Sequence, residues 1–269
     1  MSFRFILRAI ILTLLMQNLN TFATDAPRWP LKVVTTEIVP DVHKAWLADQ
    51  SGEPFLWIGD TCWFLTFKIS DEDVLHYLDN RAAKGITVVQ CMLIPWTREG
   101  DDAWFGETPV HDQKFDKPNE TYWPHVDFVV RAAKERGITL CMALAWNGCC
   151  GEGWNEILRN EYHSNNDYEP LKQYARFVGE RYVDAGNVII FLGGDSSENR
   201  DIFRLMAIEL KKVAPDLLIA HHPSSWYGHE DTYGIKSATS LGEHGQGDYL
   251  DISWTYTYWP NQNNRAHSH

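Results

Sequence analysis

The sequence predicts an α/β fold of the (β/α)8 TIM-barrel class, with about six β/α units present and a β-hairpin at the N-terminal end. Six apolar strand candidates alternate with helices or long loops at a spacing of roughly forty residues. Each strand candidate ends in a polar or aromatic loop, as barrel strands do at their functional rim. No GxGxxG or GxxxxGK motif follows the first strand, which argues against a dinucleotide-binding or P-loop fold.

The first 23 residues resemble an export signal. Arg4 and Arg8 precede an apolar stretch from Ile10 to Leu15, and small residues precede position 24. The apolar stretch is too short for a membrane span, and no later segment reaches about 18 apolar residues without charges. We therefore expect a signal peptide and a soluble, secreted or periplasmic protein.

Residues 24–51 are expected to form an N-terminal extension and hairpin. His43–Leu47 and Pro54–Ile58 would pair across the turn Asp49–Gly52, and Arg28–Val39 could add another strand. Residues 52–269 are expected to form the barrel domain. Because strands seven and eight are not recognisable, we expect either a fragment that is incomplete at its C-terminus or an atypical barrel.

The barrel elements follow in order. Ser70 with Asp73 begins the first helix, and Gly85, Gly137 and Gly186 end the first three helices. Long loops are expected at 95–121 and 147–168. The expected strands are Phe55–Ile58, Ile86–Ile94, Ile138–Trp146, Val188–Leu192, Leu217–Ala220 and Tyr249–Trp254; the expected helices are Ser70–Lys84, Tyr122–Arg136, Glu169–Ala185 and Asp201–Val213.

The stretch Asn187–Asp195, NVIIFLGGD, organises the chain. Its apolar run does not alternate with polar residues, which is typical of a parallel strand covered on both faces. Gly193 and Gly194 permit a sharp turn and open space beside Asp195, which would then stand at the carboxyl end of the strand. The alternative interpretation is that Asp195 only caps the following helix.

The composition excludes some functions and favours others. The net charge is −12, with 24 Lys plus Arg and no basic run, which argues against nucleic acid or anionic membrane surfaces as partners. The 12 Trp residues often follow predicted strands, as Trp96 does, and such rings suit stacking on the apolar faces of sugars. No CxxC or HExxH motif occurs, so we expect no metal and no cofactor.

The five cysteines are expected to be unpaired for the most part. Cys62, Cys91 and Cys141 lie in or beside apolar strands and are most simply buried hydrophobic residues. Cys149 and Cys150 are neighbours, and a bond between neighbours would be strained. They are therefore either free thiols, or one of them pairs elsewhere.

Several strand ends offer polar groups to one rim of the predicted barrel. These groups are Asp60, Trp146 with Asn147, Asp195, and His221 with His222. Alternatively, Asp60 only bonds its own turn, and the two histidines are a core residue and a rim residue. Glycoside cleavage needs a protonated carboxyl group and a second carboxylate. Asp195 can be the first; Glu243 and Asp251 are weak candidates for the second.

The sequence resembles the apiosidase-like glycoside hydrolases, family 140, which were formerly called domain of unknown function 4038. The resemblance spans about Gly52–Ser225 and rests on an ordered set of segments: GEPFLWIGDTCWFL, ISDEDVLHYLDNRAAKGITVVQ, YWPHVDFVVRAAKERGITL, YARFVGERYVDAGNVIIFLGGD and LLIAHHPSS. It implies a (β/α)8 barrel and a hydrolase that, in the characterised activity, releases apiose from the rhamnogalacturonan II side chain of pectin.

The resemblance also implies roles for individual residues. The acid of the GGD motif falls on Asp195, which is implied to be the catalytic acid/base. The GDTxW motif falls on Gly59–Thr61 and Trp63, and the HP motif on His222 and Pro223, as substrate-site positions. The family's nucleophile is a Glu in a later Gly-Glu-Pro motif, and no such motif follows Ser225 here.

The sequence therefore predicts an exported glycoside hydrolase that acts on plant or microbial polysaccharide. Trp254, Tyr256, Tyr258 and Trp259 would line the sugar site, unless they are exposed core. One rival interpretation is a carbohydrate-binding or inactive barrel that lacks the second carboxylate. Another is a metal-dependent hydrolase using His221, His222 and His244, although such barrels begin with an HxH pair at the first strand.

Overall fold

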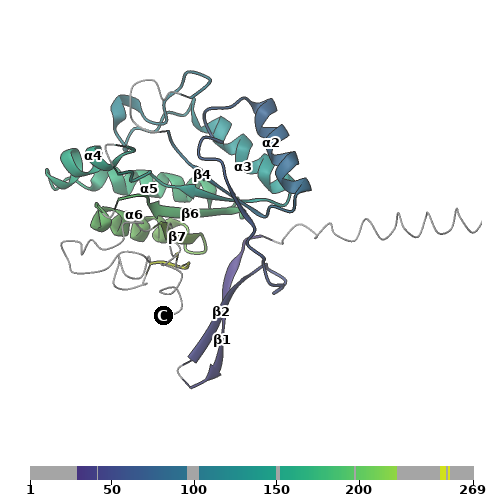
Figure 1. Ribbon diagram of the computed structural model, residues 1–269. Helices are drawn as coiled ribbons and strands as arrows, with labels where there is room; N and C mark the ends of the chain where they lie inside the picture. Colours follow the sequence, from purple (N-terminus) through teal and green to yellow (C-terminus); the bar gives the residue numbers. More distant parts are fainter. Residues whose placement is uncertain are drawn as a thin grey trace, which may run out of the picture.

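A computed structural model of the chain describes residues 29–40, 42–95, 103–149, 152–196, 198–222, 249–252 and 254. Its centre is a five-stranded sheet in the order β3-β4-β5-β6-β7, in which every neighbouring pair is parallel (Figure 1). The strands are β3 (Gly59–Thr61), β4 (Val88–Met92), β5 (Thr139–Ala143), β6 (Val188–Gly193) and β7 (Leu218–His222).

The strand order equals the chain order, which is the topology of a barrel and not of a doubly wound sheet. Right-handed crossovers in a parallel sheet then place every intervening helix on the same face. A further parallel contact joins Ala220 of β7 to Ile252, and the Ile252 backbone N–H donates to the Ile219 carbonyl. The predicted sixth strand is thus present as a single bridge beside β7, and the described sheet is part of a (β/α) barrel.

The four long helices are amphipathic and lie between successive strands. They are α2 (Asp71–Ala83), α3 (Trp123–Glu135), α5 (Glu169–Tyr182) and α6 (Arg200–Val213). Figure 1 shows α2 beside α3 at one end of the sheet and α5 beside α6 at the other. None of the helices in the described part of the chain is both long and apolar enough to cross a bilayer.

Local sequence signals set the helix ends as predicted. The Ser70 Oγ accepts the Asp73 backbone N–H at 3.2 Å and so caps α2. Gly85, Gly137 and Gly186 follow three helices with positive φ values of 75°, 74° and 80°, a conformation that glycine adopts without steric cost. The helix boundaries therefore agree with the sequence to within a few residues.

The strand β6 is buried along its whole length, as its apolar run predicts. The preceding residue, Asn187, is also fully buried, and its Nδ2 donates to the Val130 carbonyl at 3.0 Å and to the Ile138 carbonyl at 3.2 Å. This amide ties the start of β6 to α3 and to the start of β5. The centre of the sheet is thereby fixed to its helix layer.

The predicted hairpin is wrong in its pairing. The antiparallel hairpin consists of β1 (Lys32–Val39) and β2 (Val42–Ala48), and it projects away from the parallel sheet (Figure 1). The segment that was expected to pair with β2, Pro54–Ile58, makes only one antiparallel bridge, between Ala48 and Pro54. Residues 32–39 are mostly β-branched and give the longer ladder. The predicted turn at Asp49–Gly52 also forms, and the Gly52 N–H donates to the Asp49 carbonyl at 3.0 Å.

The long segments 95–121 and 147–168 contain short helices that the sequence pattern does not reveal. They are η1 (His111–Gln113), a 3₁₀ turn, then α4 (Asn155–Ile157) and η2 (Leu158–His163), a π-helix. Trp154, Leu158 and Tyr162 of the second segment are buried. Pieces of three to six residues are too short for a helical period to be visible in the sequence.

The backbone at the end of β6 lies very close to the backbones of Asn147 and His222. Gly193 and Gly194 have φ values of +82° and +155°, and a Cβ on Gly193 would lie 2.5 Å from the His222 carbonyl oxygen. A Cβ on Gly194 would lie 2.7 Å from the Asn147 carbonyl oxygen. The expectation of open space beside these glycines is therefore wrong: they are needed because three backbones approach each other closely.

We expect Gly193→Ala to lower the free energy of unfolding by about 2–4 kcal/mol, since it adds a backbone clash to the cost of a left-handed alanine. Gly85→Ala is the matched control, because its φ is +75° but no atom lies within 4 Å of the added Cβ. The control should lose only about 1–2 kcal/mol. Urea unfolding of both variants measures the difference, and equal losses would contradict the close approach.

His221 is a buried histidine in β7, and burial lowers its pKa to about 3. In the unfolded chain, this histidine has its ordinary pKa of about 6.5. Between about pH 3 and pH 6.5 the unfolded chain therefore binds a proton at His221 that the folded chain does not bind. Stability is therefore lost as the pH falls below about 6.5.

We expect His221→Gln to remove this contribution. Between pH 6.5 and 5 the wild type should lose up to about 2 kcal/mol more unfolding free energy than the variant. Urea unfolding at several pH values measures the two slopes, and His76→Gln, on the exposed side of α2, controls for the loss of a histidine. Parallel slopes for wild type and His221→Gln would show that His221 is not buried in its neutral form.

Candidate functional site

Asp195 follows β6 at the carboxyl end of the parallel sheet, where the sequence predicts it. Its backbone neighbours are attached to the strands on both sides. The Gly194 N–H donates to the His222 carbonyl at 3.2 Å, and the Ser196 N–H donates to the Asn147 carbonyl at 3.0 Å. Asp195 itself is half-buried, and no ion pair of its carboxylate is found among the described residues. A carboxyl group is thus presented on a fixed backbone at the rim where barrels carry their chemistry.

An aromatic cluster lies at the same end of the sheet and is centred on Phe191. The ring centroids of Trp63 and Trp146 are 4.9 Å apart, and Trp146 lies 5.4 Å from His222. Trp254 lies 5.3 Å from Phe191 and 5.9 Å from His222. Four residues predicted to line a sugar site therefore gather around one residue, Phe191, that the sequence did not single out.

This cluster faces away from the helices. Asp60 and Asp251 contact helices α2 and α6, and side chains alternate between the two faces along each strand. Ile252 therefore points to the face opposite Asp251, and His222 points away from the face of His221. Phe191 pairs with Ala220, which shares the face of His222, so the cluster around Phe191 lies on the face opposite the helices, which is the interior face of a (β/α) barrel.

Asp60 lies within β3 rather than after it, and its carboxylate is already occupied. One oxygen accepts the Thr61 N–H at 2.9 Å; the other pairs with the Arg81 guanidinium and accepts the Tyr77 hydroxyl at 3.1 Å. The structure thus supports the interpretation in which Asp60 serves its own strand and adds a tie to α2. Burial, with the Asp60 charge as a lesser cause, raises the pKa of the neighbouring Tyr77, so this hydroxyl stays protonated.

The two histidines also belong to β7 instead of following it. His222 joins the aromatic cluster, and its Nδ1 lies 3.3 Å from the Gly194 carbonyl oxygen. His221 is buried on the other face, and its low pKa keeps the ring neutral at physiological pH. His222 is therefore the histidine that reaches the candidate site.

Asn147 is fully buried, and it holds the loop that carries Asp195. Its Nδ2 donates to the Ser196 and Glu198 carbonyls at 3.0 and 2.8 Å, and its Oδ1 accepts from Asn199 Nδ2 at 3.1 Å. Both ends of the amide are thus used within the protein. Asn199 and Asn155 were not recognised from the sequence, where each is one polar residue in a loop without a motif around it.

The remaining predicted site residues fall into two groups. Trp96, Glu243 and Tyr256 lie outside the described residues. Asp251 is described, and its Oδ2 accepts from Lys211 Nζ at 2.6 Å and from the Ile219 N–H at 2.7 Å. This carboxylate fastens the bridge segment to α6 on the helix side of the sheet, which does not favour a role as second catalytic carboxylate.

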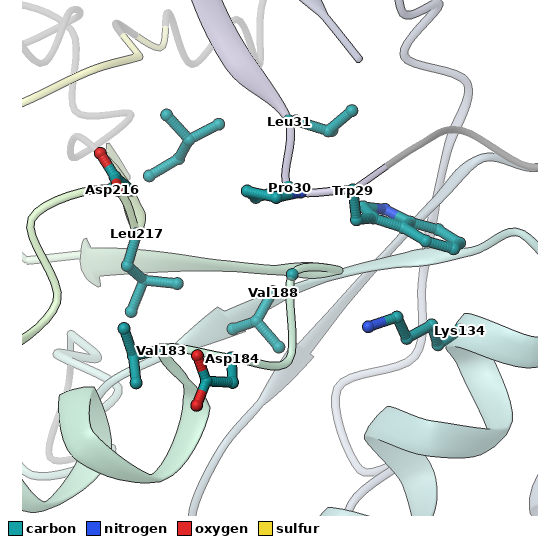
Figure 2. A pocket seen from close by; sticks show the side chains of 11 residues that line it. Trp29, Pro30, Leu31, Lys134, Val183, Asp184, Val188, Asp216 and Leu217 are labelled. Carbon is teal, nitrogen blue, oxygen red and sulfur yellow. The ribbon is translucent and has the colours of Figure 1, made fainter. Parts of the chain in front are cut away.

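A pocket of about 300 Å³ lies at the opposite end of the sheet (Figure 2). Its lining includes Val188 and Leu218, the first residues of β6 and β7, together with Trp29, Lys134 and Asp184. Asp195 is seven positions beyond Val188, or roughly 20 Å along an extended chain. The pocket is therefore separate from the rim that carries Asp195.

No group of three or more His, Cys, Asp or Glu side chains in the described ranges is arranged to hold a metal ion. Of the cysteines, Cys91 and Cys141 are buried and unpaired, and Cys62 is half-buried. Burial raises the pKa of all three thiols, so they behave as small hydrophobic residues, as predicted. Cys150 lies outside the described residues.

Comparison with solved structures supports the fold. A glycoside hydrolase superimposes with a TM-score of 0.64 at 22% identity, over 82% of this chain and 45% of that one. A glycoside hydrolase of family 5 from Bacteroides vulgatus gives 0.60 at 22% identity, over 77% and 42%. An endo-1,4-β-mannanase from Rhizomucor miehei gives 0.53 at 16% identity, over 77% and 64%. At these identities the likeness shows a shared TIM-barrel fold.

The chain spans less than half the length of the first two of these structures. Among curated proteins, no sequence matches it significantly. The sequence profile of the apiosidase-like catalytic domain, by contrast, matches residues 42–268. This match includes Asp195, the aromatic cluster and every strand of the parallel sheet, and so the chain belongs to the apiosidase-like catalytic domain family.

Proposed function

We propose that the protein is an exported glycoside hydrolase that cleaves glycosidic bonds in plant or microbial polysaccharide, with Asp195 as the general acid/base and without a cofactor. The observation that carries this proposal is the placement of Asp195 at the carboxyl end of β6, beside an aromatic surface on the interior face of the sheet. Family membership supports the reaction class. Arg4, Arg8 and the apolar stretch that follows support export.

The chemistry requires two carboxyl groups with separate roles. Asp195 would give a proton to the leaving oxygen, and a second carboxylate would attack the sugar or activate water. A separation of about 5 Å between them gives retention, and about 6.5–9.5 Å gives inversion. Glu243 stays the candidate within this sequence for the second group.

The aromatic cluster suits the binding of a sugar. Trp63 and Trp254 are half-buried, so each keeps part of its ring exposed, and an indole face can cover the apolar C–H face of a sugar ring. Asp195 lies next to Gly194, whose carbonyl contacts His222 of the same cluster. A sugar held on these rings would lie within reach of the carboxyl group.

We expect Asp195→Asn, in the full-length protein, to lower kcat about 10²–10⁴-fold on pectic oligosaccharides and on phenyl apioside, because their leaving groups need a proton. Sugar analysis of the products measures this loss. Asp184→Asn, which changes an acid in the distant pocket of Figure 2, is the matched control and should retain the wild-type rate. An unchanged rate for Asp195→Asn would remove the assignment.

We expect Trp63→Ala to raise KM by about tenfold with a smaller change in kcat, since it removes a ring that contacts bound sugar and not the reacting atoms. Trp104→Ala is the control: Trp104 is 50% exposed and packs against Phe105 and His125, away from the interior face. Initial-rate kinetics separate the two parameters. Saturable sugar binding by calorimetry without any product from the wild type would instead favour a carbohydrate-binding protein.

A further inference from the structure

Three asparagines join the loop after β5 to the loop after β6, which carries Asp195. Asn147 lies four residues after the end of β5, Asn155 is the first residue of α4, and Asn199 directly precedes α6. Asn147 and Asn155 are 0% and 8% exposed, and Asn199 is half-buried. A buried amide is costly unless its hydrogen bonds are made, so the partners of these groups show what they hold.

Asn147 holds the backbone before and after Asp195. Its N–H donates to the Gly193 carbonyl at 3.1 Å, and its carbonyl accepts the Ser196 N–H at 3.0 Å. Its side-chain Nδ2 donates to the Ser196 and Glu198 carbonyls at 3.0 and 2.8 Å. Asn147 thus makes four hydrogen bonds to the last residue of β6 and to the short loop after it, and Asp195 lies in that loop.

Asn199 and Asn155 extend this attachment. Asn199 Nδ2 donates to Asn147 Oδ1 at 3.1 Å and to Asn155 Oδ1 at 3.0 Å, and it also lies 3.1 Å from the Asn155 carbonyl oxygen. Asn155 Nδ2 donates to Ser196 Oγ and to the Gly148 carbonyl, each at 3.1 Å. The side chains therefore form a closed network that returns to Ser196, the residue after Asp195.

The network requires amides in particular. Asn147 and Asn155 each donate N–H groups and also offer a side-chain oxygen to Asn199, a combination that suits an amide side chain. An amide is also neutral, so it fixes the loop without adding a charge that would shift the pKa of an adjacent acid. Asn199 has a φ of +61°, a left-handed conformation that Asn and Asp tolerate.

We infer that Asn147, Asn155 and Asn199 are positioning residues that hold Asp195 in the geometry needed for proton transfer to the leaving oxygen. This inference rests on the proposed role of Asp195 as the general acid. Proton transfer requires heavy atoms within hydrogen-bond reach, and a displacement of about 1 Å can cost a factor of about 100 in rate. The asparagines touch neither substrate nor reacting atoms; they act through the Asp195 backbone.

The test uses Asn199→Asp in the full-length protein, which keeps size and left-handed conformation but replaces the donor by an oxygen that faces the oxygens of Asn147 and Asn155. We expect kcat on phenyl apioside to fall 10–100-fold, kcat on 2,4-dinitrophenyl apioside to fall less than threefold, and KM to change less than threefold. The matched control is Asn166→Asp, also left-handed with a φ of +51° but exposed, which should behave as the wild type.

A double-mutant comparison separates positioning from a general structural role. In the Asp195→Asn background, Asn199→Asp should cause less than a threefold further loss, because the acid it positions is already absent. An equal loss in both backgrounds, or an equal loss on both leaving groups, would overturn the inference. If Asn199→Asp does not fold, Asn199→Gly, which keeps the backbone conformation and removes the amide, is subject to the same criteria.

The same data distinguish this inference from the proposed function. If Asp195→Asn retains the wild-type rate on phenyl apioside, the assignment of the acid fails, whatever the asparagine variants do. If Asp195→Asn is inactive on phenyl apioside while Asn199→Asp and Asn155→Asp keep the wild-type kcat, the acid assignment holds and the positioning inference alone is wrong.

Discussion

The close approach of three backbones at the end of β6 is the constraint on which the rest of the site depends. Gly193 lies against the His222 carbonyl and Gly194 against Asn147, with no space for a side chain on either. This contact lets the loop after β6 bond to Asn147, in the segment after β5, on one side and to His222 of β7 on the other. Asp195 therefore projects from a backbone fixed by its neighbours, although it lies in a loop.

The close contact of the three backbones at the end of β6 also brings the aromatic residues together. Trp146 precedes Asn147, and His222 is the residue that Gly193 and Gly194 contact, so the contacts that fix the loop also set the separation of these two rings. Phe191, two residues before Gly193, packs against both rings, with its centroid 6.4 Å from that of Trp146 and 6.1 Å from that of His222. The acid and the apolar surface beside it are thus two consequences of one packing arrangement.

The sequence predicts the elements well because local signals determine them: an unbroken apolar run for β6, and glycines at the ends of three helices. It singles out Asp195 as a candidate because one motif carries the position. It does not reveal that Asp60 is bound by Arg81, which is 21 positions away and reaches it only after α2 packs on β3. The asparagine network is hidden for the same reason, since the bonds between its two loops join residues 41–52 positions apart.

The partners of the carboxylates distinguish support from chemistry. Asp60 and Asp251, at the two ends of the described sheet, are each neutralised by a cation of a covering helix, and each also accepts a backbone N–H of a strand. Carboxylates with these partners join a strand to the helix that covers it. Asp195 differs from both: neutral amides fix the backbone beside it, and no ion pair of its carboxylate is found among the described residues. For the proposed role of Asp195 as general acid, a fixed backbone is what keeps the carboxyl group within hydrogen-bond reach of the leaving oxygen.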